Sequence, residues 1–68
     1  MIVSEYKGCD IFRQAHAETQ TVSVRVRDGI NLIYVREMPY VTLKHAIELM
    51  GLARELAHDY IDQRENDQ

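Results

Sequence analysis

The side chains in this sequence that could take part in chemistry are three histidines and one cysteine, together with a set of acidic residues. His16, His45 and His58 lie far apart, and none has a second ligand at the close spacing of an HxxxH or CxxC metal site. Cys9 would need a low pKa and a neighbouring base to act as a nucleophile. His16, seven positions along the same predicted strand, is too distant in an extended chain. We therefore expect structural roles for all four residues and no metal or cofactor.

Carboxylates that act as a general acid and base must project into a pocket. Glu48, Glu55 and Asp59 instead fall on the polar side of a predicted helix, and a chain of 68 residues has little room to enclose a cavity. We therefore expect a protein that is not an enzyme.

The element that must organise the chain is a helix predicted over residues 43–62. Thr42 is placed to cap its first amides, and the helix contains no proline. At about 100° per residue, its apolar face collects these side chains: Leu43, Ala46, Ile47, Met50, Ala53, Ala57, Tyr60 and Ile61. The polar residues 63–68 are expected to fray into a solvated tail.

The residues before the helix predict an antiparallel sheet over about residues 2–36. Val22, Val24 and Val26 alternate with polar residues, which indicates a strand buried on one face. Asp28-Gly29 predicts a hairpin loop that pairs Arg27 with residue 30 and leaves the next strand apolar on both faces. The facing of the strand predicted over 9–17 stays open. The fold class is α+β: a single domain, residues 1–68, with a three-stranded meander packed on one long C-terminal helix (βββα).

The charge of the chain bears on which partners it could bind, and its cysteine content bears on the cellular compartment. The net charge of −3 lies in residues 41–68, where three basic side chains accompany six acidic ones. An acidic balance disfavours nucleic acid, whose binding depends on phosphate neutralisation. One cysteine precludes an internal disulfide and suits a reducing compartment. No signal peptide or membrane-spanning run is recognisable, so we expect a cytoplasmic protein without a membrane partner.

Two surfaces are candidates for partner binding, and the first is on the helix. Its apolar arc is wider than one sheet can cover, and a stripe at steps of three and four residues could meet a partner helix. The stripe comprises Leu49, Leu52, Ala53, Leu56 and Tyr60. Three readings are open: the chain's own N-terminal segment or the linker at Tyr40 covers the stripe, a second copy covers it in a homodimer, or an unidentified protein covers it. A small domain without disulfide or metal favours homodimerisation.

The second candidate surface is the open face of the sheet. The predicted register places Arg25, Arg27, Leu32 and Tyr34 there, and arginine with tyrosine is typical of contact surfaces. The arginine stems could equally cover the apolar side chains on a solvated face. Protein binding is the next reading, and DNA binding by an accessory protein the last.

The order of turns and caps resembles that of small uncharacterised bacterial and phage proteins with a strand-strand-strand-helix plan. The resemblance rests on Tyr6-Lys7-Gly8, Asp28-Gly29, Thr42-Leu43 and Ile61-Asp62. It implies an accessory factor of a mobile element, such as an anti-CRISPR-like inhibitor of a host system, and it transfers no functional residue.

Overall fold

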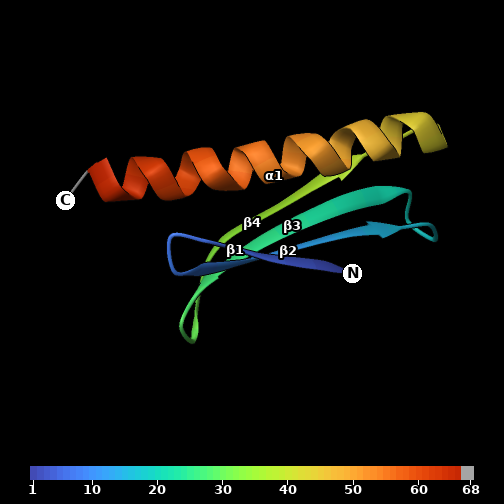
Figure 1. Ribbon diagram of the computed structural model, residues 1–68. Coiled ribbons are helices and arrows are strands. Elements are labelled where there is room, and N and C mark those ends of the chain that lie inside the picture. The colour runs from blue at the N-terminus through green and yellow to red at the C-terminus, as the bar shows by residue number, and fades with distance from the viewer. Residues whose placement is uncertain (67–68) are drawn as a thin grey trace.

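The computed structural model describes residues 1–66 and contains one sheet and one helix (Figure 1). The elements are β1 (Ile2–Tyr6), β2 (Cys9–His16), β3 (Thr21–Asp28), β4 (Asn31–Pro39) and α1 (Leu43–Asn66). Each strand pairs antiparallel with the next, in the order β1-β2-β3-β4. α1 lies across one face of the sheet and leaves the other face open. The α+β fold with a C-terminal helix is confirmed, but the sheet has four strands and the prediction of three is wrong.

The additional strand exists because the chain reverses at Lys7-Gly8. Both residues have positive φ, 49° and 82°, which is the backbone of a two-residue hairpin loop between Tyr6 and Cys9. A lysine in this conformation is uncommon. The turn converts the first residues of the chain into an edge strand, β1.

The β3–β4 hairpin carries an irregularity that changes which side chains share a face. Asp28 pairs with Asn31 and Arg27 with Leu32, but Val26 pairs with Tyr34, so the ladder gains one residue in β4. Such a bulge moves every later side chain of the strand to the opposite face. The predicted register is wrong for two reasons. The loop is Gly29-Ile30 rather than Asp28-Gly29, which shifts the pairing of Arg27 from residue 30 to Leu32. The bulge then puts Tyr34 on the helix side, where its ring is 4.8 Å from that of Tyr60.

β4 also runs further than predicted, to Pro39 rather than to about residue 36. Pro39 pairs with Thr21 at the end of an edge strand, where a missing N–H removes no bond to a further strand.

The core lies between α1 and the sheet. Ile11, Val22, Val24 and Val26 are fully buried on the sheet side. The helix side chains that meet them follow steps of three and four residues: Ala46, Leu49, Ala53, Ala57 and Ile61. The predicted apolar face was partly wrong, because Leu43 and Ile47 are 76% and 66% exposed. Leu43 lies in the first turn and Ile47 at the margin of the arc, and the buried line is rotated toward Leu49.

The start of α1 is held by specific contacts. The amide of His45 donates to Thr42 Oγ1 at 3.1 Å, as expected for the cap, and the amide of Val41 donates to His45 Nδ1 at 3.4 Å. The helix continues to Asn66, beyond the predicted end at residue 62, and residues 67–68 of the predicted tail lie outside the described residues. Within residues 1–66, no helix is both long and apolar enough to cross a bilayer.

Candidate interaction surface

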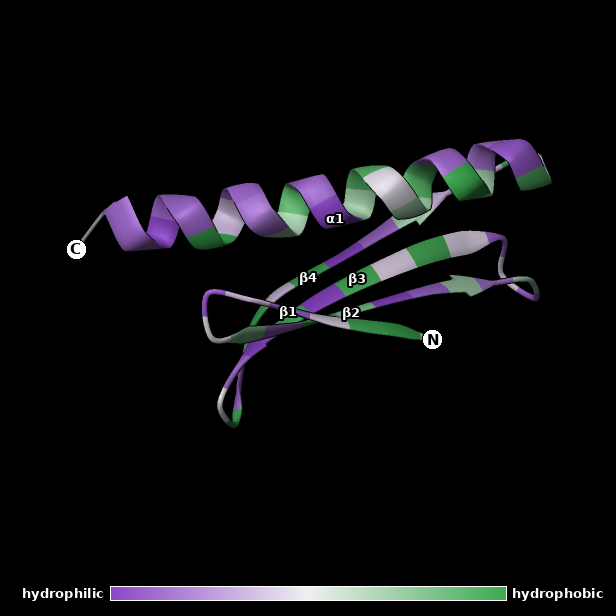
Figure 2. Cartoon of the chain, in the orientation of Figure 1, coloured by the Kyte–Doolittle hydropathy of each residue, from purple (hydrophilic) through white to green (hydrophobic). Residues whose placement is uncertain are grey.

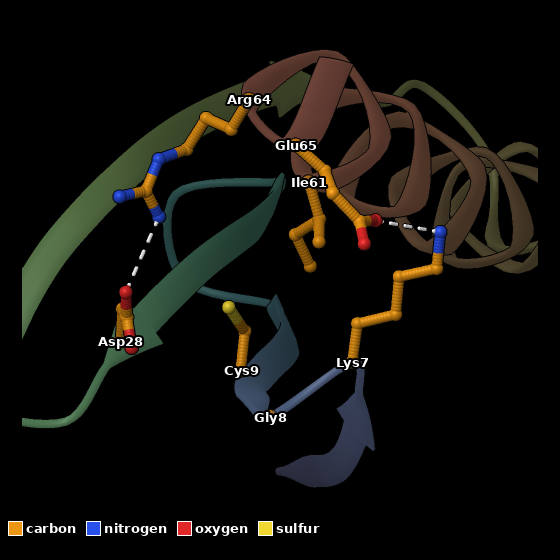
Figure 3. Close-up of a pocket in the computed structure, with 7 residues that line it drawn as sticks. All are labelled: Lys7, Gly8, Cys9, Asp28, Ile61, Arg64 and Glu65. Atoms are coloured by element: carbon orange, nitrogen blue, oxygen red, sulfur yellow. Dashed lines mark hydrogen bonds and ion pairs between the residues drawn. The ribbon is translucent and has the colours of Figure 1, made fainter. Parts of the chain in front are cut away.

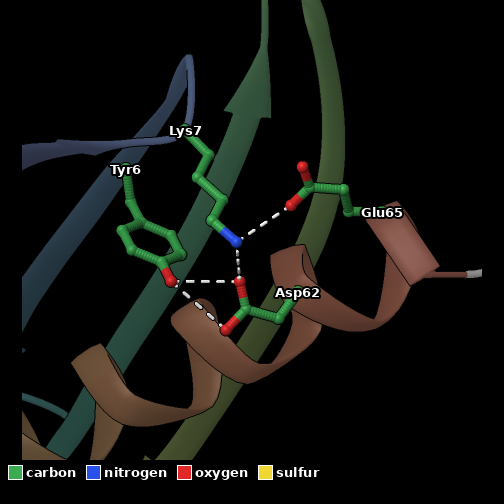
Figure 4. Close-up of polar contacts among 4 residues, drawn as sticks. All are labelled: Tyr6, Lys7, Asp62 and Glu65. Carbon is green, nitrogen blue, oxygen red and sulfur yellow. Dashed lines mark hydrogen bonds and ion pairs between the residues drawn. The ribbon is translucent and has the colours of Figure 1, made fainter.

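The β1–β2 turn is tied to the end of α1 by a polar cluster (Figure 4). Lys7 Nζ lies 2.7 Å from Asp62 and 2.9 Å from Glu65, and the Tyr6 hydroxyl donates to the Asp62 carboxylate at 3.0 Å. The His58 ring stacks on Tyr6 with 3.9 Å between centroids. We call these five residues the clasp. It explains why the last turns of α1 stay helical despite their acidic composition.

The charges of the clasp stabilise one another rather than poise a group for reaction. Hydrogen bonds to Asp62 and Glu65 raise the pKa of Lys7 well above its ordinary value, so the amine stays protonated. Hydrogen bonds from Lys7 and Tyr6 lower the pKa of Asp62. A protonated lysine is not a nucleophile and a low-pKa carboxylate is a weak base.

Beside the clasp lies an open cavity of about 240 Å³ (Figure 3). Its lining is Lys7, Gly8, Cys9, Asp28, Ile61, Arg64 and Glu65. The charged groups there are paired with one another: Lys7 with Glu65, and Arg64 with Asp28 at 3.5 Å. Cys9 is buried, and that burial raises the pKa of its thiol, the opposite of what a nucleophile needs.

The three histidines lie at separate places, each with a structural contact. His16 Nε2 is 2.8 Å from Ser23 Oγ on the sheet, His45 accepts at the start of α1, and His58 stacks in the clasp. Within the described residues 1–66, no group of three His, Cys, Asp or Glu side chains is arranged to hold a metal ion.

The predicted leucine stripe is not exposed as a unit. Leu49 and Ala53 belong to the core, with 9% and 0% of their surface exposed. Leu56 is half-buried against the same core, and Tyr60 is half-buried with its ring beside that of Tyr34. Leu52 is the leucine of the stripe that stays open, at 42%.

The sheet face opposite α1 carries rows of registered side chains, two of which extend across all four strands. Registered residues of neighbouring strands project to the same side, and the β3 valines are buried under α1, so Arg25 and Arg27 project to the open side. The Arg27 row runs across the four strands as Glu5, Asp10, Arg27 and Leu32. The Arg25 row runs as Val3, Phe12, Arg25 and Val35.

This open face is rich in exposed apolar surface. Val3, Leu32 and Val35 are 57%, 58% and 54% exposed, and Figure 2 shows the hydrophobic start of β1 at the edge of the sheet. The Arg27 guanidinium lies 5.0 Å from the Phe12 ring centroid and 3.0 Å from Asp10. A shallow depression of about 240 Å³ is lined by Met1, Phe12, Arg25, Arg27 and Leu32.

The structure therefore brings together three of the four residues predicted for this face: Arg25, Arg27 and Leu32. The bulge puts Val35 on this face, where the prediction had placed Tyr34, and turns Tyr34 to the helix side. Sequence reasoning missed Val3, Phe12 and Val35, since their facing depends on β1 and on the bulged register. Alternation within residues 9–16 alone did not fix the side on which Phe12 projects.

Comparisons of this chain with protein-family models, with curated proteins and with solved structures return no match. The resemblance to small bacterial and phage proteins therefore stays a prediction, and the candidate surface is argued from its own geometry.

Proposed function

We propose that this chain is a non-catalytic interaction protein that binds another protein through the open face of its sheet. The observation that carries the proposal is the exposure of Val3, Leu32 and Val35, each more than half open, beside Phe12 and two arginines. Contiguous apolar surface framed by polar groups is typical of protein contact sites, and arginine and aromatic residues are enriched at their centres.

The charges of the same face favour a protein over nucleic acid. Asp10 neutralises Arg27 at 3.0 Å, and Glu5 lies in the same row. The chain as a whole carries a charge of −3. Phosphate neutralisation drives binding to nucleic acid, and this face offers little uncompensated positive charge for it. A role as an inhibitor of a host system rests only on the sequence resemblance and stays a prediction.

The proposal is tested by comparing what three forms of the immobilised protein capture from an extract of the source organism. Val35→Asp places a carboxylate on the open face, and Leu52→Asp makes the same chemical change on the outer side of α1. Both positions are about half exposed, so both variants should fold. We expect the wild type and Leu52→Asp to capture the same proteins, and Val35→Asp to lose them.

Circular dichroism of both variants controls for folding. Capture that persists in Val35→Asp, or that fails only in Leu52→Asp, would contradict the assignment to the sheet face. The second result would instead return the contact to α1.

A further inference from the structure

We propose that a second copy of this chain covers the open face, sheet against sheet, about a two-fold axis that runs parallel to the strands between β2 and β3. This inference names a partner for the proposed function and rests on it. Its basis is that three of the four pairs of side chains in the two rows are complementary under that symmetry.

A two-fold axis of this kind places β2 over β3 of the other copy and β1 over β4, while each row stays over the same row. In the Arg27 row, Asp10 then faces the arginine of the second copy. In the Arg25 row, Phe12 faces the second Arg25, and Val3 faces Val35. Acid meets base, ring meets guanidinium and valine meets valine, and each contact occurs twice. The fourth pair, Glu5 over Leu32 of the second copy, lies at the edge of the sheet, where the carboxylate can reach solvent.

The contacts at the centre of the interface persist although the two sheets are twisted. Packed sheets meet at about 30°, so side chains far from the axis are displaced most. Strands are spaced about 4.8 Å apart and the two rows about 7 Å apart. The four side chains on the two central strands therefore lie within about 5 Å of the centre of the interface: Asp10, Phe12, Arg25 and Arg27. At that distance the angle between the sheets displaces facing side chains by roughly 2 Å, which these long side chains can span.

Charge balance distinguishes a second copy from an arbitrary partner. Asp10 and Arg27 already pair within one chain at 3.0 Å. Two such pairs related by the axis form a ring of four alternating charges. Within residues 1–66, Arg25 has no salt bridge, and the second Phe12 ring would give it a cation–π contact.

The available surface suits a dimer of this size. Four strands of about seven residues make a face of roughly 20 by 23 Å, and projecting side chains raise its accessible area toward the ~800 Å² per partner of standard interfaces. That amount is about a sixth of the 4790 Å² surface of one chain. Pairing would also supply a second apolar layer to a domain with a thin core.

The first test is the solution mass of the full chain, measured by sedimentation equilibrium from about 10 µM to about 500 µM. We expect a species of 16.0 kDa, twice the 8.0 kDa of one chain. Val35→Asp should weaken the dimer roughly 100-fold, because it replaces a valine that faces Val3 of the second copy with a charged side chain. Leu52→Asp, on α1, should leave the dimer unchanged.

The second test uses charge exchange to show that the pair crosses the axis. Asp10→Arg and Arg27→Asp each create like charges between copies, so each variant alone should be monomeric. In a mixture, the new arginine of one chain faces the new aspartate of the other, and the two unchanged residues also face each other. The 16.0 kDa species should therefore reappear only on mixing. Arg27 is exposed and Asp10 is half-exposed, and a surface pair contributes little to folding.

Three results would overturn the inference. They are a wild-type chain that stays monomeric throughout the concentration range, a dimer lost in Leu52→Asp but kept in Val35→Asp, and charge-exchange variants that stay monomeric when mixed. The first of these leaves the proposed function standing if capture from the extract still depends on Val35. Loss of that dependence, with the dimer intact, would leave the second copy as the protein bound through the open face and refute binding to a different protein.

Discussion

Replacing Gly51 by alanine should stabilise the protein, because this glycine lies inside α1 where its freedom serves no visible purpose. A β-carbon added at Gly51 meets no atom within 4 Å, and its backbone is not in the left-handed region. Glycine inside a helix costs about 0.8–1.0 kcal/mol relative to alanine. The new methyl group gains no burial, so helix propensity alone sets the magnitude. The free energy of unfolding should therefore rise by about 1 kcal/mol, which corresponds to about 4–8 °C in Tm for a domain of this size.

The other two glycines provide matched controls. Gly8 and Gly29 also have open space around the added β-carbon, but their φ angles are +82° and +62°. Alanine in that conformation costs about 1–2 kcal/mol, so Gly8→Ala and Gly29→Ala should be less stable than the wild type. Urea denaturation followed by far-UV circular dichroism, at one fixed protein concentration, measures all three.

The reasoning requires the change in the free energy of unfolding to have opposite signs at Gly51 and at the two turn glycines. If Gly51→Ala lowered the free energy of unfolding, the helix would need the glycine for a close approach that a single chain does not show. If Gly29→Ala were as stable as Gly51→Ala, the argument from backbone conformation would fail.

Three further predictions concern the helix and its ends. Leu49→Ala should lower the free energy of unfolding by about 2–5 kcal/mol, because this side chain is buried in the core. Leu52→Ala should lower it by less than about 1 kcal/mol. Urea denaturation measures both variants, and equal losses would refute the placement of Leu49. Thr42→Ala should cost about 1 kcal/mol through loss of the cap on the His45 amide, and Thr42→Ser, which keeps the hydroxyl, should recover most of that loss in the same assay. Because Lys7 and Tyr6 lower the pKa of Asp62 below its ordinary 3.8, the stability contributed by this carboxylate is present above that pH and is lost as the pH falls through the lowered value. Acid titration of stability should thus be shallower in Asp62→Asn than in the wild type, and identical curves would contradict the role of the clasp.

The parts of the fold that the sequence predicted well are those with a strong local signal. The alternating valines at 22, 24 and 26 indicated a half-buried strand, and Thr42 indicated the start of the helix, because each pattern satisfies backbone and burial requirements over a few residues. The fourth strand was missed because β1 is only five residues long and its turn uses lysine in a left-handed conformation. Gly8 marks the turn in the sequence, but it does not show that residues 2–6 pair with β2. The contacts of Lys7 with Asp62 and Glu65, which hold the turn in place, come from 55 and 58 residues away.

The candidate surface was predicted in part for a similar reason. Arg25 and Arg27 follow directly from the alternation in β3, but the residues beside them depend on the bulge in β4. Leu32, Ile33 and Tyr34 are all apolar and could occupy either face of a sheet, so their sequence does not determine the register. The packing of Tyr34 on Tyr60 involves an element that follows later in the chain.

The clasp has a consequence for the order in which the protein forms during synthesis. Its ion pairs join residues separated by 55 and 58 positions, so they cannot exist until residues 62 and 65 have left the ribosome. The hairpins β2–β3 and β3–β4 use short loops and can close while translation continues. Attachment of the β1–β2 turn to the helix therefore follows closure of these hairpins.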